Sequence, residues 1–148
     1  MNGRTVSVAV VTTVFVLLTG CRAMGKPDQD GGSHMRVHYL EIVCADVSAQ
    51  CAALERIHGL SFGPAVADLG QARVAEATDG CRIGVRAPLA AHEAPIIRTY
   101  LEVEDIARAV QNAEAAGAVI AYPPTRQGDT GTWAIYFLGD VQIGLWQR

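Results

Sequence analysis

The chain has 148 residues, of which half are apolar and 18% are charged, and its net charge is -3 at pH 7. This length is enough for one domain with a substantial apolar core. The sequence contains neither a basic run nor interleaved basic and aromatic residues, so nucleic acid is not expected as a partner.

The N-terminal segment 1–21 has the pattern of a secretion signal. Arg4 is followed by an apolar stretch over 6–18, which is shorter than the roughly 20 residues that span a bilayer as a helix. The stretch ends in Leu18-Thr19-Gly20-Cys21, which resembles a bacterial lipobox. An ordinary signal peptide or an uncleaved anchor is the alternative. We predict that Cys21 is lipidated and anchors the protein in the cell envelope, on the periplasmic face of the outer membrane.

Residues 22–35 are rich in Gly, Asp and Pro and lack apolar periodicity, which predicts a flexible tether. The remaining chain contains an internal repeat. The strand-like segment Tyr39-Leu40-Glu41-Ile42 returns as Tyr100-Leu101-Glu102-Val103, and Ile83-Gly84-Val85 returns as Ile143-Gly144-Leu145. Matches in the same order at nearly one period indicate a single unit used twice.

The first unit begins with an apolar strand over 37–43. Asp46 is a good N-cap for a helix that ends at Gly59, with Val47, Cys51, Leu54 and either Ile57 or His58 on its packed face. A short strand is expected around 60–62. Residues 71–78 and 81–86 should form a hairpin across Asp79-Gly80.

The linker 87–95 leads to the second unit, which has the same order of elements. We expect a strand over 96–103, a helix over 105–116 and a short strand over 118–122 that is stopped by Pro123-Pro124. Strands over 132–138 and 141–147 then pair across Gly139-Asp140. The prediction is an α+β fold made of βαβββ followed by βαβββ.

This doubled pattern, with its Asp-initiated helices and the closing Gly144-Leu145-Trp146-Gln147, resembles the vicinal oxygen chelate superfamily and especially its hydroxylase-like branch. The superfamily includes glyoxalase I, extradiol dioxygenases and bleomycin-resistance proteins. The resemblance covers residues 36–148. It implies that modules 36–86 and 96–148 form a cupped mixed β-sheet around one ligand cavity. It also implies that the chain can form a homodimer.

Strand alternation predicts which side chains face the cup. The apolar members of each strand should pack on the helices, which leaves the polar and aromatic members on the opposite side. A solvated sheet face is the alternative. The side chains expected in the cup are Tyr39, Glu41, Arg82, Arg86, Arg98, Tyr100, Glu102, Gln142 and Trp146.

The resemblance also implies where metal ligands would stand. Metal-dependent members place one ligand on the first strand of each module and a carboxylate on each closing strand, and these positions are Tyr39, Arg98, Gly84 and Gly144 here. Arginine stays protonated and glycine has no side chain, so we predict that the metal site is lost and that no cofactor is bound. His38 with Glu41 is the weaker alternative, because alternation turns His38 toward the helix.

The remaining cup chemistry suits a small anionic or aromatic ligand, because guanidinium groups bind carboxylates or phosphates and aromatic faces bind planar groups. The arginines and glutamates could instead pair with each other. Buried free thiols are expected at Cys44, Cys51 and Cys81, and a local bridge between Cys44 and Cys51 is the alternative. Small-molecule binding is the preferred function. A lyase, isomerase or oxygenase using Glu41 or Glu102 as acid–base is the alternative, and a protein-binding surface module is the third hypothesis.

Overall fold

The computed structural model describes residues 35–148, which lie within one compact unit. The predicted signal peptide, the lipidated Cys21 and the tether up to residue 34 lie outside the described residues and stay predictions. Within residues 35–148, no helix has both the length and the apolar character needed to cross a membrane.

The two modules have the predicted order of elements and confirm the α+β fold. The first consists of β1 (Val37–Val43), α1 (Val47–His58), β2 (Ala65–Val66), a 3₁₀ turn (Ala67–Leu69), β3 (Ala72–Glu76) and β4 (Arg82–Arg86). The second consists of β5 (Ile96–Glu102), α2 (Ile106–Ala115), β6 (Val119–Arg126), β7 (Thr132–Leu138) and β8 (Val141–Gln147).

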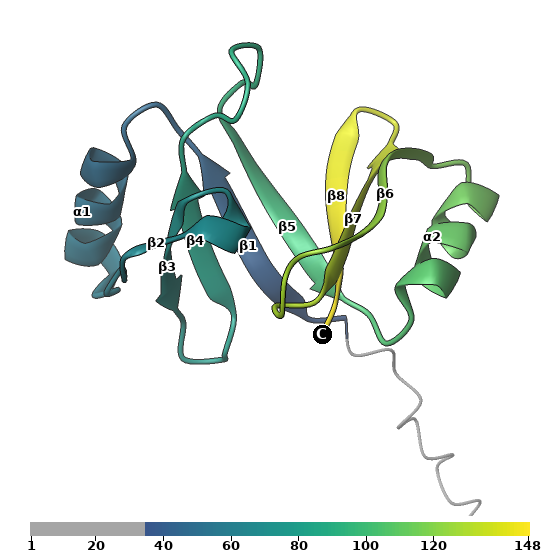
Figure 1. The fold of residues 1–148 in the computed structure, drawn as a ribbon, viewed down its shortest axis with the longest axis horizontal. Helices are drawn as coiled ribbons and strands as arrows, with labels where there is room; N and C mark the ends of the chain where they lie inside the picture. Colours follow the sequence, from purple (N-terminus) through teal and green to yellow (C-terminus); the bar gives the residue numbers. More distant parts are fainter. Residues whose placement is uncertain (1–34) are drawn as a thin grey trace, which may run out of the picture. The chain divides into compact units, whose positions relative to one another are not determined.

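All eight strands form one mixed sheet with the order β2-β3-β4-β1-β5-β8-β7-β6. The modules meet at the antiparallel pair β1–β5, while each first strand runs parallel to the closing strand of its own module. Tyr39 and Tyr100, which are equivalent in the repeat, face each other at this junction. The helices cover the outer sides of the two halves of the sheet, which leaves the inner sides facing one another (Figure 1).

Both long helices begin as the sequence predicts. The carboxylates of Asp46 and Asp105 accept hydrogen bonds at 2.9 Å from the backbone N–H groups of Ala49 and Arg108. These bonds satisfy donors that would otherwise have no partner in the first turn. Cys51 packs on Val85 of the sheet, as expected for the apolar face of α1.

The end of α1 corrects one expectation. Ile57 is 69% exposed rather than packed, and His58 is also exposed. At about 100° per residue, Ile57 lies well off the stripe that carries Cys51 and Leu54. His58 does lie on that stripe, but it is the last residue of the helix.

The short strand expected at 60–62 is absent, and the first hairpin is preceded instead by β2. One backbone bond joins this segment to β3, from Gly63 N–H to Val74 O at 2.9 Å, and side chains make further bonds to its backbone. Phe62 N–H donates to Glu55 Oε1 at 3.1 Å, and the Arg73 guanidinium donates to the carbonyls of Phe62 and Gly63 at 2.9 and 3.0 Å.

The Pro123-Pro124 pair does not stop β6, which corrects a second expectation. The strand continues to Arg126, and its register with β7 shifts between Tyr122 and Thr125, where the prolines lie. Because β6 is the last strand of the sheet, one side of it needs no hydrogen-bond donors, so proline is tolerated there.

A β-bulge in β1 corrects the expected orientation of His38. Val37 pairs with Leu101 and Tyr39 pairs with Tyr100, which leaves His38 as an extra residue in β1. Its ring lies 5.3 Å from that of Trp146, on the cup side of the sheet rather than against α1. The side chain is buried, with 6% of the residue exposed.

Candidate functional site

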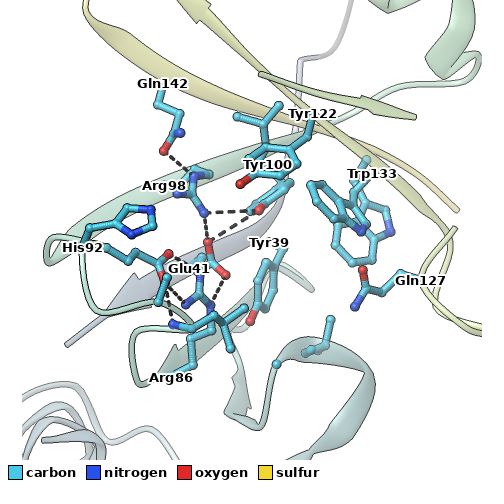
Figure 2. A pocket seen from close by; sticks show the side chains of 17 residues that line it. Tyr39, Glu41, Arg86, His92, Arg98, Tyr100, Tyr122, Gln127, Trp133 and Gln142 are labelled. Carbon is cyan, nitrogen blue, oxygen red and sulfur yellow. Dashed lines mark hydrogen bonds and ion pairs between the residues drawn. The ribbon is translucent and has the colours of Figure 1, made fainter. Parts of the chain in front are cut away.

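A cavity of about 330 Å³ lies between the inner sides of the two modules (Figure 2). Polar side chains gather on one side of it and aromatic rings on the other. It is lined by Tyr39, Glu41, Leu69, Gly70, Arg86, Leu89, Ala90, His92, Glu93, Arg98, Tyr100, Tyr122, Gln127, Trp133, Ile135, Gln142 and Trp146.

Three rings at the junction of the modules form an aromatic layer, which we define as Tyr39, Tyr100 and Trp146. Their centroids are 5.7 to 5.9 Å apart and the rings are tilted or edge-on to one another, which are favourable arrangements for aromatic side chains. All three are at least 95% buried, with exposed fractions of 2%, 5% and 2%.

The glycines of the closing strands make room for this layer. A Cβ at Gly84 would lie 1.7 Å from the Tyr39 hydroxyl oxygen, and a Cβ at Gly144 would lie 2.3 Å from Cδ1 of Tyr100. Any larger residue at either position would have to displace a ring. The space beside the inner face of each closing strand is therefore filled by a tyrosine.

Glu41 links two arginines that come from different modules. Its Oε1 accepts from Arg86 Nε at 2.7 Å, and its Oε2 accepts from Arg98 Nη1. Glu41 and Arg98 are register partners on β1 and β5, so the pairing of the two central strands brings them together. Arg98 Nε also donates to Gln142 Oε1 at 2.7 Å. All three residues are buried, with exposed fractions of 6% for Glu41, 4% for Arg86 and 7% for Arg98.

The linker between the modules supplies a second carboxylate. Glu93 accepts from Arg86 Nη1 and Nη2 at 2.8 and 2.7 Å, and its Oε2 also accepts from Leu89 N–H at 2.7 Å. The bonds from Arg86 lower the pKa of Glu93 to about 2. Burial alone would lower the pKa of Arg86, but its bonds to Glu93 and Glu41 outweigh that effect and raise it.

The same surroundings keep the two tyrosines of the layer protonated. Burial, followed by the negative charge of Glu41, raises the pKa of Tyr100 to about 12 and raises that of Tyr39 further. Neither hydroxyl is therefore a source of phenolate at neutral pH.

The cavity brings together all of the residues expected in the cup except Arg82 and Glu102. Glu41 and Glu102 are equivalent in the repeat, but their strands are antiparallel, so they lie on opposite sides of the Tyr39–Tyr100 pair. Glu102 binds Arg148 and lies 3.8 Å from His38 Nδ1. The expectation that Glu102 lines the same cavity as Glu41 is therefore wrong.

Arg82 belongs to the same region as Glu102. Its Nη2 lies 2.9 Å from His38 Nε2, and its guanidinium carbon lies 5.9 and 5.8 Å from the ring centroids of Tyr39 and Trp146. Arg82 thus contacts the aromatic layer without lining the cavity. Burial, followed by the charge of Arg82, lowers the pKa of His38.

Several lining residues were not expected from the sequence, although alternation along a strand points to some of them. Alternation along β7 would have placed Trp133 and Ile135 on the inner side, because Ala134 and Tyr136 pack against α2. His92 and Glu93 lie in the linker, where no periodicity indicates the direction of a side chain.

The residues at the metal positions implied by the resemblance do not form a ligand set. Within residues 35–148, no group of three or more His, Cys, Asp or Glu side chains is placed to hold a metal ion. His38 and Glu41 belong to separate networks, the first with Arg82 and Glu102 and the second with Arg86 and Arg98. The described cysteines, Cys44, Cys51 and Cys81, are free thiols as predicted, but only Cys51 is fully buried and the other two are partly exposed. Burial raises the pKa of each.

Comparison with known proteins supports the fold through structure rather than sequence. No family model and no curated protein sequence matches the chain. A hypothetical protein from Bacillus halodurans C-125 superposes with a TM-score of 0.63 at 11% identity, over 78% of this chain and 95% of the other. A glyoxalase/bleomycin resistance protein/dioxygenase superfamily member from Vibrio splendidus 12B01 gives 0.56 at 17% identity, over 77% and 99%. The chain has the vicinal oxygen chelate fold.

Enzymes are also among the proteins of similar structure. Methylmalonyl-CoA epimerase from Mycobacterium tuberculosis gives a TM-score of 0.60 at 17% identity, over 76% of this chain and 87% of the epimerase. At identities this low, the superpositions establish a shared fold and nothing about function. A single fold hosts many chemistries. The function has to be argued from the cavity itself.

Proposed function

We propose that the protein binds a small molecule in the cavity between its two modules, without a metal ion. The observation that carries this proposal is the cavity itself, whose volume of about 330 Å³ falls in the range of small-molecule sites. It combines apolar walls with a few buried polar groups, as such sites do. The predicted lipid anchor at Cys21 would hold this binding domain at the membrane.

The loss of the superfamily metal site is part of the proposal. Arg98 is a cation paired with Glu41, and Gly84 and Gly144 offer no donor atom. Tyr39 and Tyr100 fill the space that a side chain on either glycine would need. A carboxylate side chain at either position would therefore have to displace a ring, so binding is proposed to depend on the protein side chains alone.

The lyase, isomerase or oxygenase alternative is not favoured by the arrangement of the carboxylates. A general base needs an oxygen within hydrogen-bond reach of the substrate proton. Both oxygens of Glu41 accept from guanidinium groups, and Glu102 does not line the cavity. Conversion of any cavity ligand by the purified protein would nevertheless restore this alternative.

A thermal-shift screen of a fragment library tests the proposal. A ligand at 100 times its Kd stabilises the folded state by about 2.7 kcal/mol. The control pair is Ala90→Trp, which places an indole on a residue that lines the cavity, and Ala87→Trp, which places it on an exposed neighbour outside the lining. We expect fragments that stabilise the native protein and Ala87→Trp but not Ala90→Trp. A library without any such fragment would contradict the proposal.

A further inference from the structure

The charges around the cavity are already balanced by the protein. Its two arginines, Arg86 and Arg98, face two carboxylates, Glu41 and Glu93, so these four groups sum to zero. Every one of the four side chains is in an ion pair, at distances as short as 2.7 Å for Arg86. Each arginine therefore already has a carboxylate partner within the protein.

Glu93 is the group that completes this balance. Arg86 directs Nε to Glu41 and directs both Nη atoms to Glu93, so the end of its guanidinium group is occupied by the linker carboxylate. A carboxylate is the natural bidentate partner of this fork, and Glu93 holds the place that the carboxylate of a ligand would take. Glu93 itself lines the cavity.

An anionic ligand would find no surplus positive charge among these four groups, because Glu41 and Glu93 balance Arg86 and Arg98. Removing a carboxylate from water is costly, and close pairing with a cation is what offsets that cost. Pairing with Arg86 would require displacing Glu93, which is bound by two guanidinium nitrogens and by Leu89 N–H. The opposite side of the cavity offers planar surfaces, including Tyr122 and Trp133, whose centroids are 5.7 Å apart.

We infer that the ligand class is a neutral, planar aromatic molecule, and that Glu93 determines this specificity by masking Arg86. This inference rests on the proposed small-molecule function and narrows the ligand predicted from the sequence, which was either anionic or aromatic. Specificity of this kind comes from excluding the wrong ligand as much as from binding the right one. Neutralising Glu93 should therefore open the cavity to aromatic carboxylates.

A matched pair of probes, 2-naphthamide and 2-naphthoate, tests the inference because the two have nearly the same shape and differ in charge. Titration calorimetry on the native protein should show the amide binding about tenfold or more tightly than the carboxylate. In Glu93→Gln the preference should shift toward the carboxylate by about tenfold or more. Glu93→Ala is the second variant, and it should shift the preference in the same direction.

Glu104→Gln is the charge control, because Glu104 is exposed and does not line the cavity. It should leave the ratio of the two affinities unchanged. Tighter binding of 2-naphthoate by the native protein, or an unchanged ratio in both Glu93 variants, would overturn the inference. Failure of both probes to bind any form would overturn it too, and fragments that bind the cavity in the thermal-shift screen would then still support the broader function.

Discussion

Glu41 accepts hydrogen bonds from two buried guanidinium groups, one from β4 of the first module and one from β5 of the second. Removing one member of a buried ion pair is costly because it leaves an uncompensated charge, whereas replacing the whole pair with apolar groups can cost little. The Glu41–Arg98 pair should show this asymmetry.

We predict that Glu41→Leu destabilises the protein by about 3–5 kcal/mol, because Arg98 loses its carboxylate. Arg98→Leu should cost less, since Glu41 keeps its bond to Arg86. The double variant should cost less than the sum of the single variants by about 1–3 kcal/mol. Urea denaturation of the four proteins measures this coupling, and simple additivity would show that the pair contributes no interaction across the modules.

Glu93 gives a prediction about acid stability. Its pKa is lowered from 4.5 in the unfolded chain to about 2 in the folded protein. The stabilisation is therefore fully present above pH 4.5 and is lost as the pH falls toward 2. A shift of this size corresponds to about 3 kcal/mol.

The corresponding experiment compares Glu93→Gln with the native protein between pH 7 and pH 2. The native protein should be more stable by up to about 3 kcal/mol at pH 7, and the difference should shrink below pH 4.5. Glu76→Gln, on an exposed residue of β3, is the control and should show little difference. A gap between native protein and Glu93→Gln that stays constant down to pH 2 would be inconsistent with the Arg86–Glu93 pair.

Gly84 gives a prediction about close packing. Gly84→Ala should destabilise the protein by about 1–3 kcal/mol, because the new methyl group overlaps the Tyr39 ring. The cost should fall when Tyr39 is replaced by Leu in the same chain. Gly63→Ala is the matched control, since its Cβ would meet only Val74 O at an ordinary 3.6 Å. Equal costs for Gly84→Ala in both backgrounds would contradict the described position of the ring.

At the scale of the elements, the features that depend only on residues close together in the sequence were predictable. The Asp46 and Asp105 caps and the Asp79-Gly80 turn are local signals, and the structure has all three. The bulge at His38 was not predictable, because it exists only in the register between β1 and β5. The course of β6 past its proline pair likewise depends on its place at the edge of the sheet.

The α1 cap can be tested directly. Asp46→Ala should reduce the free energy of unfolding by about 1 kcal/mol, because the Ala49 N–H loses its acceptor. Asp46→Ser should recover most of this loss, since serine is also a good N-cap. Chemical denaturation measures both values. A serine variant as unstable as the alanine variant would show that the charge of Asp46, rather than its capping bond, matters.

At the scale of the whole molecule, the repeat predicted the two modules and the sheet but could not predict the contents of the cavity. Repeat symmetry treats Glu41 and Glu102 as equivalent, yet the antiparallel junction places only Glu41 in the cavity. Glu93 belongs to neither module's repeat, and its position depends on how the linker returns to Arg86. The fold was therefore more predictable than the site.

We propose that the cavity binds its ligand without a metal ion, because a ligating side chain at Gly84 or Gly144 would overlap Tyr39 or Tyr100. Metal content, measured by inductively coupled plasma mass spectrometry on protein purified without chelator or a histidine tag, tests this most directly. We predict less than about 0.1 transition-metal ion per chain, because the positions of the ligand set hold glycine and arginine. One bound metal ion per chain would contradict the claim and make the enzyme alternative the leading one.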